Sequence, residues 1–378
     1  MRTSSLCKYG LSIAAVLLFS PIAFGQEGEE SFRLEGIHRF GVEAASGWTV
    51  FRDSIEEGSR KVLPSEVFAE SSGSSAVFLL RKLDGRETTY RVSAGKRKRN
   101  FVVKVFKPDT VSSFTHKSKG NPDVRTFIVV PATLSEKSRL VVVMHGLGRN
   151  ADGYIASWED WAKVNDSVVI APEFRREDWR SSAEYNSGNM IAGGKRVPRS
   201  RWSFQVAEDI AERVRKGFGL AAARYDMFGH SAGGQFVHRF SLFMPEANVR
   251  LFLAANSGWY TAPDLTIEFP YGLRHPLLEI ASEDVIEWTK KSVVILRGTE
   301  DTERTPNLRQ TPEADAQGQH RYDRAGYMFR KISEVNPETT WKMIEVPGAG
   351  HSQKVMAPAA QQVIEDANRQ EEGRARPR

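Results

Sequence analysis

The stretch YDMFGHSAGGQFVHRF, residues 225–240, joins a short apolar run to a helical pattern at a single serine. The run at 225–228 is short enough for a buried strand, and the apolar residues after 232 are spaced for one face of a helix. A glycine stands two residues before Ser231 and another stands two residues after it. The sequence therefore predicts a tight strand-to-helix turn with a serine at its tip.

Strand-like and helical segments alternate along the chain on both sides of this turn. Predicted strands cover 125–130, 140–144, 168–172, 225–228, 250–256, 292–298 and 341–346, and predicted helices cover 204–218, a segment from 232, 324–334 and a segment from 353. Buried strands that alternate with helices form mostly parallel sheets covered on both faces. We therefore predict an α/β fold with a mostly parallel sheet flanked by helices.

A serine at such a turn has a chemical use. Gly-x-Ser-x-Gly between a strand and a helix is the pattern of a nucleophile elbow, in which the turn lifts the hydroxyl clear of the sheet. A serine hydroxyl is a weak nucleophile unless a base and a group that orients the base lie within reach. Ser231 is therefore the predicted nucleophile, and its partners are expected in the order serine, acid, histidine.

An acid and a histidine follow the serine in this order. Asp301 comes just after one predicted strand, and His351 lies in VPGAGHSQ after the next. The carboxyl ends of strands in an open α/β sheet carry the loops that build active sites, so both residues are predicted partners of Ser231. Glu300 and Glu303 are competing candidates for the acid.

Two backbone N–H groups are predicted to bind the oxyanion. One belongs to Ala232, the residue after the nucleophile, and the other to Leu147 in the glycine-rich loop HGLGRNADG. His145 begins this loop, but it precedes the serine in the chain. We expect it to order the loop rather than to act as the base.

Four other side chains lie near the predicted site. Trp259 and Tyr260 follow the predicted strand 250–256, so they could line a substrate pocket or pack beneath the loop. His230 stands beside the serine, and His238 lies on the helix that follows it. For these two histidines we expect packing roles.

The first 25 residues have the pattern of a secretory signal peptide. Basic residues come first, residues 11–19 form an apolar run, and small residues end the segment at Gly25. The run is short for a membrane span, so we expect cleavage and a periplasmic or secreted mature chain. Cys7 is the only cysteine, so the mature chain would have no disulfide and no thiolate chemistry.

Residues 26–120 differ from the rest of the chain. They are rich in β-branched and aromatic residues, with Asp84-Gly85 as a hairpin signal between two such runs. We expect a small β-rich module here, a linker at 113–123 and a catalytic domain over 121–378.

The composition excludes several function classes. The net charge of +6 is mild, and basic residues are scattered among acidic ones, which gives no support for nucleic-acid binding. No later segment is apolar enough to span a membrane. No metal-ligand spacing, phosphate-binding loop or dinucleotide fingerprint is present, so we expect neither a metal nor another cofactor.

Four motifs together resemble the α/β-hydrolase superfamily. They are VVVMHGLGRNADGY, FGHSAGGQFVHRF, GTEDT and VPGAGHS, and the likeness covers residues 125–365. They resemble most the secreted esterases that include polyhydroxybutyrate depolymerases and feruloyl esterase-like proteins. The resemblance implies a carboxylic ester hydrolase with Ser231, Asp301 and His351 as its triad. The segment 305–324 matches no substrate-binding element of those enzymes, and the chain before 120 lies outside the resemblance.

The leading hypothesis is thus a secreted serine esterase that acts on a small or polymeric ester. A peptidase or amidase is an alternative, because the same triad cleaves both kinds of bond. A hydrolase-fold binding protein without activity is a second alternative, although a complete set of three catalytic groups speaks against it.

Overall fold

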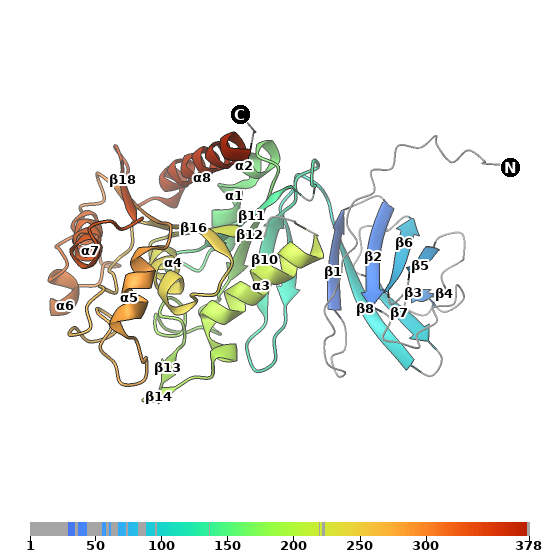
Figure 1. Ribbon diagram of the computed structural model, residues 1–378, viewed down its shortest axis with the longest axis horizontal. Helices are drawn as coiled ribbons and strands as arrows, with labels where there is room; N and C mark the ends of the chain where they lie inside the picture. Colours follow the sequence, from blue (N-terminus) through green and yellow to red (C-terminus); the bar gives the residue numbers. More distant parts are fainter. Residues whose placement is uncertain are drawn as a thin grey trace. The chain divides into compact units, whose positions relative to one another are not determined.

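The structure is a computed structural model (Figure 1), in which some parts of the chain are described and others are not. Described are the backbone of eight strands between Glu29 and Phe106, and residues 106–375 apart from 136, 219 and 221–223. The expected signal peptide, residues 1–25 with Cys7, lies outside the described residues. The chain divides into two compact units, Met1–Phe106 with Lys216–Ala221 and the remainder.

The first unit is built from strands, as the sequence predicts. One sheet has the order β1 (Glu29–Leu34), β8 (Arg97–Phe106), β7 (Thr88–Ala94), β3 (Ile55–Glu57) and β4 (Arg60–Lys61), and another has the order β2 (Ile37–Glu43), β6 (Ser75–Arg81) and β5 (Val67–Ser72). The hairpin predicted around Asp84-Gly85 is wrong, because the flanking strands β6 and β7 lie in different sheets. Both edges of β6 are already paired, with β2 and with β5.

The second unit contains an eight-stranded, mostly parallel sheet. Its strand order is β18 (Lys342–Val346), β17 (Val293–Gly298), β16 (Val249–Ala255), β15 (Tyr225–His230), β11 (Arg139–Met144), β12 (Ser167–Glu173), β10 (Val124–Val129) and β9 (Ser112–His116). Only the pairs of β10 with β12 and of β9 with β10 are antiparallel within this sheet. The predicted α/β fold class is confirmed.

Strand β9 overlaps the segment predicted as a linker, and that prediction is wrong. The strand pairs along β10, and the side chains of Phe114 and His116 are buried. Its sequence SSFTH looks like a linker because only alternate residues face the core of a half-buried edge strand. Accordingly, the two units divide after Phe106, and β9 belongs to the unit that contains the large sheet.

Helices cover both faces of this sheet (Figure 1). On one face, side chains of α1 (Ala151–Ala156), α2 (Glu159–Val164) and α8 (Gln353–Ala375) join strand residues such as Val141 and Phe228 in one buried cluster. On the other face lies α4 (Ala232–Phe243), where the rings of Phe240 and Phe252 are 6.4 Å apart. This arrangement holds the turn between β15 and α4 at the carboxyl edge of the sheet.

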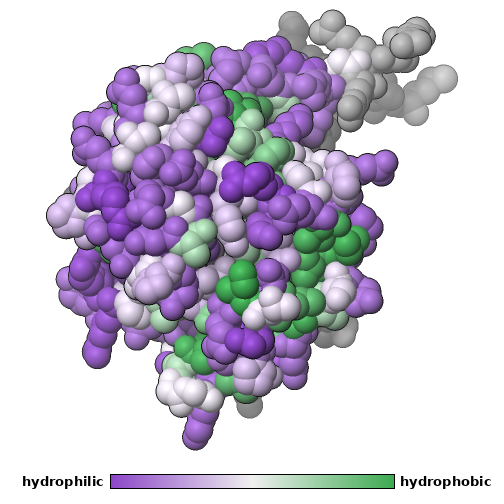
Figure 2. All heavy atoms as spheres, turned by 90° about the vertical axis from the view of Figure 1, so that its left-hand side faces the viewer, coloured by the Kyte–Doolittle hydropathy of each residue, from purple (hydrophilic) through white to green (hydrophobic). Residues whose placement is uncertain are grey.

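Further helices and short elements complete the second unit. They are α3 (Ser203–Gly217), α5 (Ser282–Thr289), α6 (Pro312–Asp315), α7 (Arg321–Val335), the 3-10 helix Arg199–Arg201 and the strands β13 (Ile191–Ala192) and β14 (Lys195–Arg196). Helices α1, α2, α5 and α6 are absent from the sequence prediction. Hydrophilic residues cover most of the face drawn in Figure 2, with apolar residues in smaller groups. In the described part of the chain, no helix has the length and apolarity of a membrane span.

Candidate active site

Ser231 is the single residue between β15 and α4. Its backbone has a conformation that residues other than glycine rarely adopt. Its φ is 60° and its ψ is −117°. Its N–H donates to the Ala255 carbonyl of the neighbouring strand at 2.9 Å, which holds the turn in place. A non-glycine residue in this region is strained, and such strain gathers at functional sites.

The two glycines around Ser231 are required by close backbone contacts. A Cβ on Gly229 would lie 2.2 Å from the Gly233 carbonyl oxygen. A Cβ on Gly233 would lie 2.1 Å from the Met144 carbonyl oxygen. A side chain at either position would push α4 away from the neighbouring strands. The two glycines therefore allow the tight turn that the sequence predicts.

The three residues predicted as partners are joined by hydrogen bonds. Nε2 of His351 lies 3.0 Å from Oγ of Ser231, and Nδ1 of the same ring lies 2.7 Å from Oδ2 of Asp301. Asp301 is buried, whereas Glu300 and Glu303 are exposed to solvent. Of the three candidate acids, Asp301 is the one that the structure places on the histidine.

The second oxygen of Asp301 also has a partner. Nη1 of Arg321 donates to Oδ1 at 3.3 Å, and Nη2 of the same guanidinium contacts the Thr305 hydroxyl at 3.4 Å. Arg321 is the first residue of α7 and is buried. Both carboxylate oxygens are therefore held, one by the histidine and one by a cation. Nothing in the sequence around Arg321 marks it as a partner of the acid.

Asn256 ties together the two loops that carry the acid and the histidine. Its Oδ1 accepts from the Gly298 N–H at 2.8 Å, and its Nδ2 donates to the Gly350 carbonyl at 3.1 Å. The side chain is buried, and its φ of 44° suits an asparagine. Its place at the end of the predicted strand 250–256 is the only signal in the sequence that could have pointed to it.

His230 packs beside His351, as expected. The centroids of the two imidazole rings are 4.7 Å apart, and Nδ1 of His230 lies 3.1 Å from the Tyr154 hydroxyl. Burial, and then the nearby His351, lower the pKa of His230 well below its ordinary value. His230 is therefore neutral and adds no second positive charge next to His351.

His145 orders the loop that contains Leu147. Nε2 of His145 accepts the Phe174 N–H at 3.0 Å, and its Nδ1 lies 3.0 Å from the Gly146 carbonyl. Burial lowers the pKa of His145 to about 3, which keeps it neutral. The loop approaches the serine closely, because a Cβ on Gly146 would lie 3.5 Å from the Cβ of Ser231. Leu147 is the next residue, and its carbonyl accepts from Arg176 at 2.9 Å.

The two aromatic residues after β16 are almost fully buried. Tyr260 has no exposed surface, and its ring lies 5.0 Å from that of His238. This favours the packing interpretation for Tyr260 and agrees with the core role expected for His238. Trp259 is 3% exposed, and the guanidinium groups of Arg239 and Arg309 lie against its ring.

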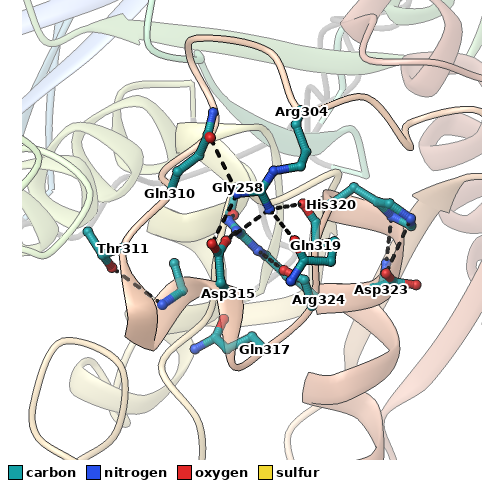
Figure 3. A network of polar contacts seen from close by, with 12 residues as sticks. Gly258, Arg304, Gln310, Thr311, Asp315, Gln317, Gln319, His320, Asp323 and Arg324 are labelled. Carbon is teal, nitrogen blue, oxygen red and sulfur yellow. Dashed lines mark hydrogen bonds and ion pairs between the residues drawn. The ribbon is translucent and has the colours of Figure 1, made fainter.

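The segment 305–324, which matches no substrate-binding element of the resembled esterases, contains the short helix α6 and leads into α7. Figure 3 shows Arg304 and Arg324 both directed at Asp315, at 3.0 and 2.9 Å. Arg324 also donates to the Gly258 carbonyl at 2.6 Å. This network fixes the loop against the segment that carries Trp259. In the described residues, no group of three or more potential side-chain ligands could hold a metal ion.

The fold and the site can be compared with solved structures. Poly(aspartic acid) hydrolase-1 from Sphingomonas sp. KT-1 is 36% identical in sequence, with a TM-score of 0.65, over 68% of this chain and 98% of that chain. The chain is an α/β-hydrolase of the polyhydroxybutyrate depolymerase-like branch. A poly(3-hydroxybutyrate) depolymerase from Bordetella parapertussis is 28% identical, also with a TM-score of 0.65, over 68% of this chain and 91% of that chain. No protein-family model and no curated protein matches the hydrolase.

Proposed function

We propose that this hydrolase cleaves carboxylic esters through Ser231, His351 and Asp301. The observation that carries the proposal is the continuous hydrogen-bond chain, at 3.0 Å from serine to histidine and 2.7 Å from histidine to acid. A histidine in this position can take the serine proton, and a carboxylate on its other nitrogen fixes the tautomer that accepts it. The strained backbone at Ser231 supports the same role.

In the first half of the reaction, Oγ of Ser231 attacks the ester carbonyl while Nε2 of His351 takes the hydroxyl proton. The tetrahedral oxyanion is held by the N–H groups of Ala232 and Leu147. The Ala232 N–H is available because the first N–H groups of a helix have no partner within it. The imidazolium then gives its proton to the leaving alcohol, which leaves an acyl-enzyme.

In the second half, water takes the place of the alcohol. His351 removes a proton from the water, which attacks the acyl carbon, and the same two N–H groups hold the new oxyanion. The proton returns to Ser231 as the acid product leaves. Asp301 stays ionised throughout and stabilises the imidazolium that forms in each half.

Amide cleavage is the second candidate function. The observation that favours it is the name of the 36% identical relative, a poly(aspartic acid) hydrolase. The same three residues would act in the same order, with an amine as the leaving group.

Matched substrates test the proposal. A short neutral acyl group is offered as its 4-nitrophenyl ester and as its 4-nitroanilide, and a fluorophosphonate probe reports whether the serine is activated. We expect labelling at Ser231 and turnover of the ester well above that of the anilide. Faster turnover of the anilide would replace the ester proposal with the amide one, and an unlabelled chain would support a binding protein without activity.

We also propose that the hydrolase is exported and that residues 1–25 are removed. The support is the basic, apolar and small-residue pattern of that segment. Sequencing the N-terminus of protein from the native host should give a start near Gln26. A start at Met1 would contradict export by this route.

A further inference from the structure

Two guanidinium groups stack on one buried tryptophan. The Cζ atom of Arg239 lies 4.0 Å from the ring centroid of Trp259, and that of Arg309 lies 4.9 Å from it. Arg239 is 1% exposed and Trp259 is 3% exposed, while Arg309 is half-buried. Contact with the indole face offsets part of the cost of removing these charges from water, but two neighbouring cations still repel each other.

Neither arginine forms an ion pair among the described residues, although Arg309 is near enough to the exposed Glu313 for their charges to interact. Nε of Arg239 donates to the Thr261 hydroxyl at 2.7 Å and its Nη1 donates to the Asn186 carbonyl at 2.9 Å, but its Nη2 is buried without a partner. Arg309 reaches only two hydroxyls, those of Tyr271 at 3.2 Å and Ser182 at 3.3 Å. These are long, neutral contacts that an anion could readily replace.

Other buried arginines of the described chain show the usual arrangement. Arg250 pairs with Asp226 at 2.5 Å, and Arg321 and Arg324 each pair with an aspartate. Arg149 has no carboxylate partner, but both of its terminal nitrogens donate to backbone carbonyls. Arg239 differs from all of these, because one terminal nitrogen is unpaired and the nearest charged group is another cation. A buried guanidinium with an unpaired nitrogen and a neighbouring cation is a favourable environment for a negatively charged group.

The stack lies on the same face of α4 as Ser231. Ser231, Gln235 and Arg239 follow each other at four-residue spacing, which places them in one row along the helix. Asn186 links the last two, since its amide donates to the Gln235 side chain at 2.8 Å and its carbonyl accepts from Arg239. Trp259 and Arg309 come from loops that follow β16 and β17, at the edge of the sheet that carries the candidate triad.

We propose that Arg309 and Arg239, stacked on Trp259, form a subsite for a carboxylate group carried by the substrate. Arg309 contacts the carboxylate directly through its two terminal nitrogens, a geometry that suits two-pronged binding. Arg239 adds a second positive charge on the same indole ring. The inference rests on the proposed hydrolase function and narrows its substrates to esters or amides that bear a carboxylate roughly 12 Å from the cleaved bond, the rise of eight helical residues.

Two peptides that differ only in charge test the subsite. Acetylated tetra-aspartate and tetra-asparagine are titrated calorimetrically into the full chain carrying Ser231→Ala, at physiological ionic strength. We expect tetra-aspartate to bind about tenfold more tightly or better, because hydrogen bonds between a guanidinium and a carboxylate are stronger than those to a neutral amide. Adding Arg309→Gln should remove most of this preference, and Arg309→Lys should retain part of it because the charge remains.

The control is Arg180→Gln in the same background. Arg180 is an exposed arginine two residues before Ser182. Its replacement by glutamine changes the net charge of the protein by the same amount as Arg309→Gln does. We expect it to change the preference by less than about twofold, in line with a screened surface charge. Equal binding of the two peptides, or equal effects of Arg309→Gln and Arg180→Gln, would overturn the subsite.

The outcome is independent of the ester proposal. Binding to a chain without Ser231 requires no turnover, so a failure of ester hydrolysis leaves the peptide preference unchanged. Conversely, an active esterase that binds both peptides equally would refute the subsite alone.

Discussion

Nη1 of Arg321 lies 3.3 Å from Oδ1 of Asp301, and both side chains are only 2% exposed. Arg321 contacts the carboxylate oxygen that His351 does not, and together the two contacts fix the orientation of the Asp301 carboxylate. Arg321 touches no reacting atom in the proposed mechanism, so it is a positioning residue that acts through Asp301.

Replacing Arg321 by methionine should therefore affect both stability and rate. The free energy of unfolding should fall by about 3–5 kcal/mol, because the change leaves a buried carboxylate without its cation. In the folded fraction, kcat for a short ester should fall about tenfold or more with little change in KM, since the acid is displaced rather than the substrate site. Denaturant titration and steady-state kinetics measure the two effects.

Arg196→Met is the matched control, because Arg196 pairs with Glu279 at the surface, where both side chains are about half exposed or more. An exposed ion pair contributes about 0–1 kcal/mol, so stability and kcat should both stay close to those of the parent. Similar losses in the two variants would show that Arg321 has no special role.

The turn at Ser231 and the main strands could be predicted because their signals are local. Two glycines around one serine, a short apolar run before it and a helical pattern after it all lie within sixteen letters of sequence. The acid and the histidine could be predicted because chain order and strand ends restrict the choices. Glu300 and Glu303 stayed open, because only three-dimensional geometry shows which carboxylate meets the imidazole.

The remaining features depend on contacts between distant segments. Arg321 meets Asp301 across twenty residues, and Asn256 meets Gly350 across ninety-four, so no short window of sequence contains either pair. Strand β9 was mistaken for a linker because an edge strand with one buried face needs few apolar residues. The stack on Trp259 joins a helix and two loops, and it could not be read from any of them alone.

Replacing each of the three candidate carboxylates by its amide identifies the acid. Asp301→Asn should lower kcat by about 10⁴-fold, because the amide cannot hold the required tautomer of His351. Glu300→Gln and Glu303→Gln should stay within a few-fold of the parent enzyme, since both side chains are exposed. Ester turnover at one fixed pH measures all three. Near-full activity of Asp301→Asn would mean that another carboxylate serves as the acid.

The glycine before the serine gives a test of the turn itself. Gly229→Ala would bring a Cβ to 2.2 Å from the Gly233 carbonyl, so we expect insoluble protein or loss of measurable activity. Gly373→Ala is the control, because it lies within α8 with nothing within 4 Å of the added atom. That change should be neutral or stabilise by up to about 1 kcal/mol. An active, stable Gly229→Ala would contradict the proposed tightness of the elbow.

The pH dependence of stability should contain a contribution from His145. Its pKa is about 3 in the folded chain and about 6.5 when unfolded. Between these values the unfolded state binds one more proton, so the free energy of unfolding falls as pH falls, by about 1.4 kcal/mol per pH unit from this residue. His145→Gln should flatten the slope by that amount between about pH 6 and 4.5. Parallel slopes in denaturant titrations of parent and variant would show that His145 takes up its proton without unfolding.

The central claim is that Ser231 is the nucleophile of an ester hydrolase, and the turnover of Ser231→Ala tests it most directly. The substitution removes one oxygen and should leave the melting temperature close to that of the parent, so a change in rate reports chemistry. We predict that kcat for the 4-nitrophenyl ester falls by about 10⁴-fold or more, and that adding His351→Ala lowers it little further, because the triad acts as a unit. Turnover by Ser231→Ala within tenfold of the parent would contradict the account.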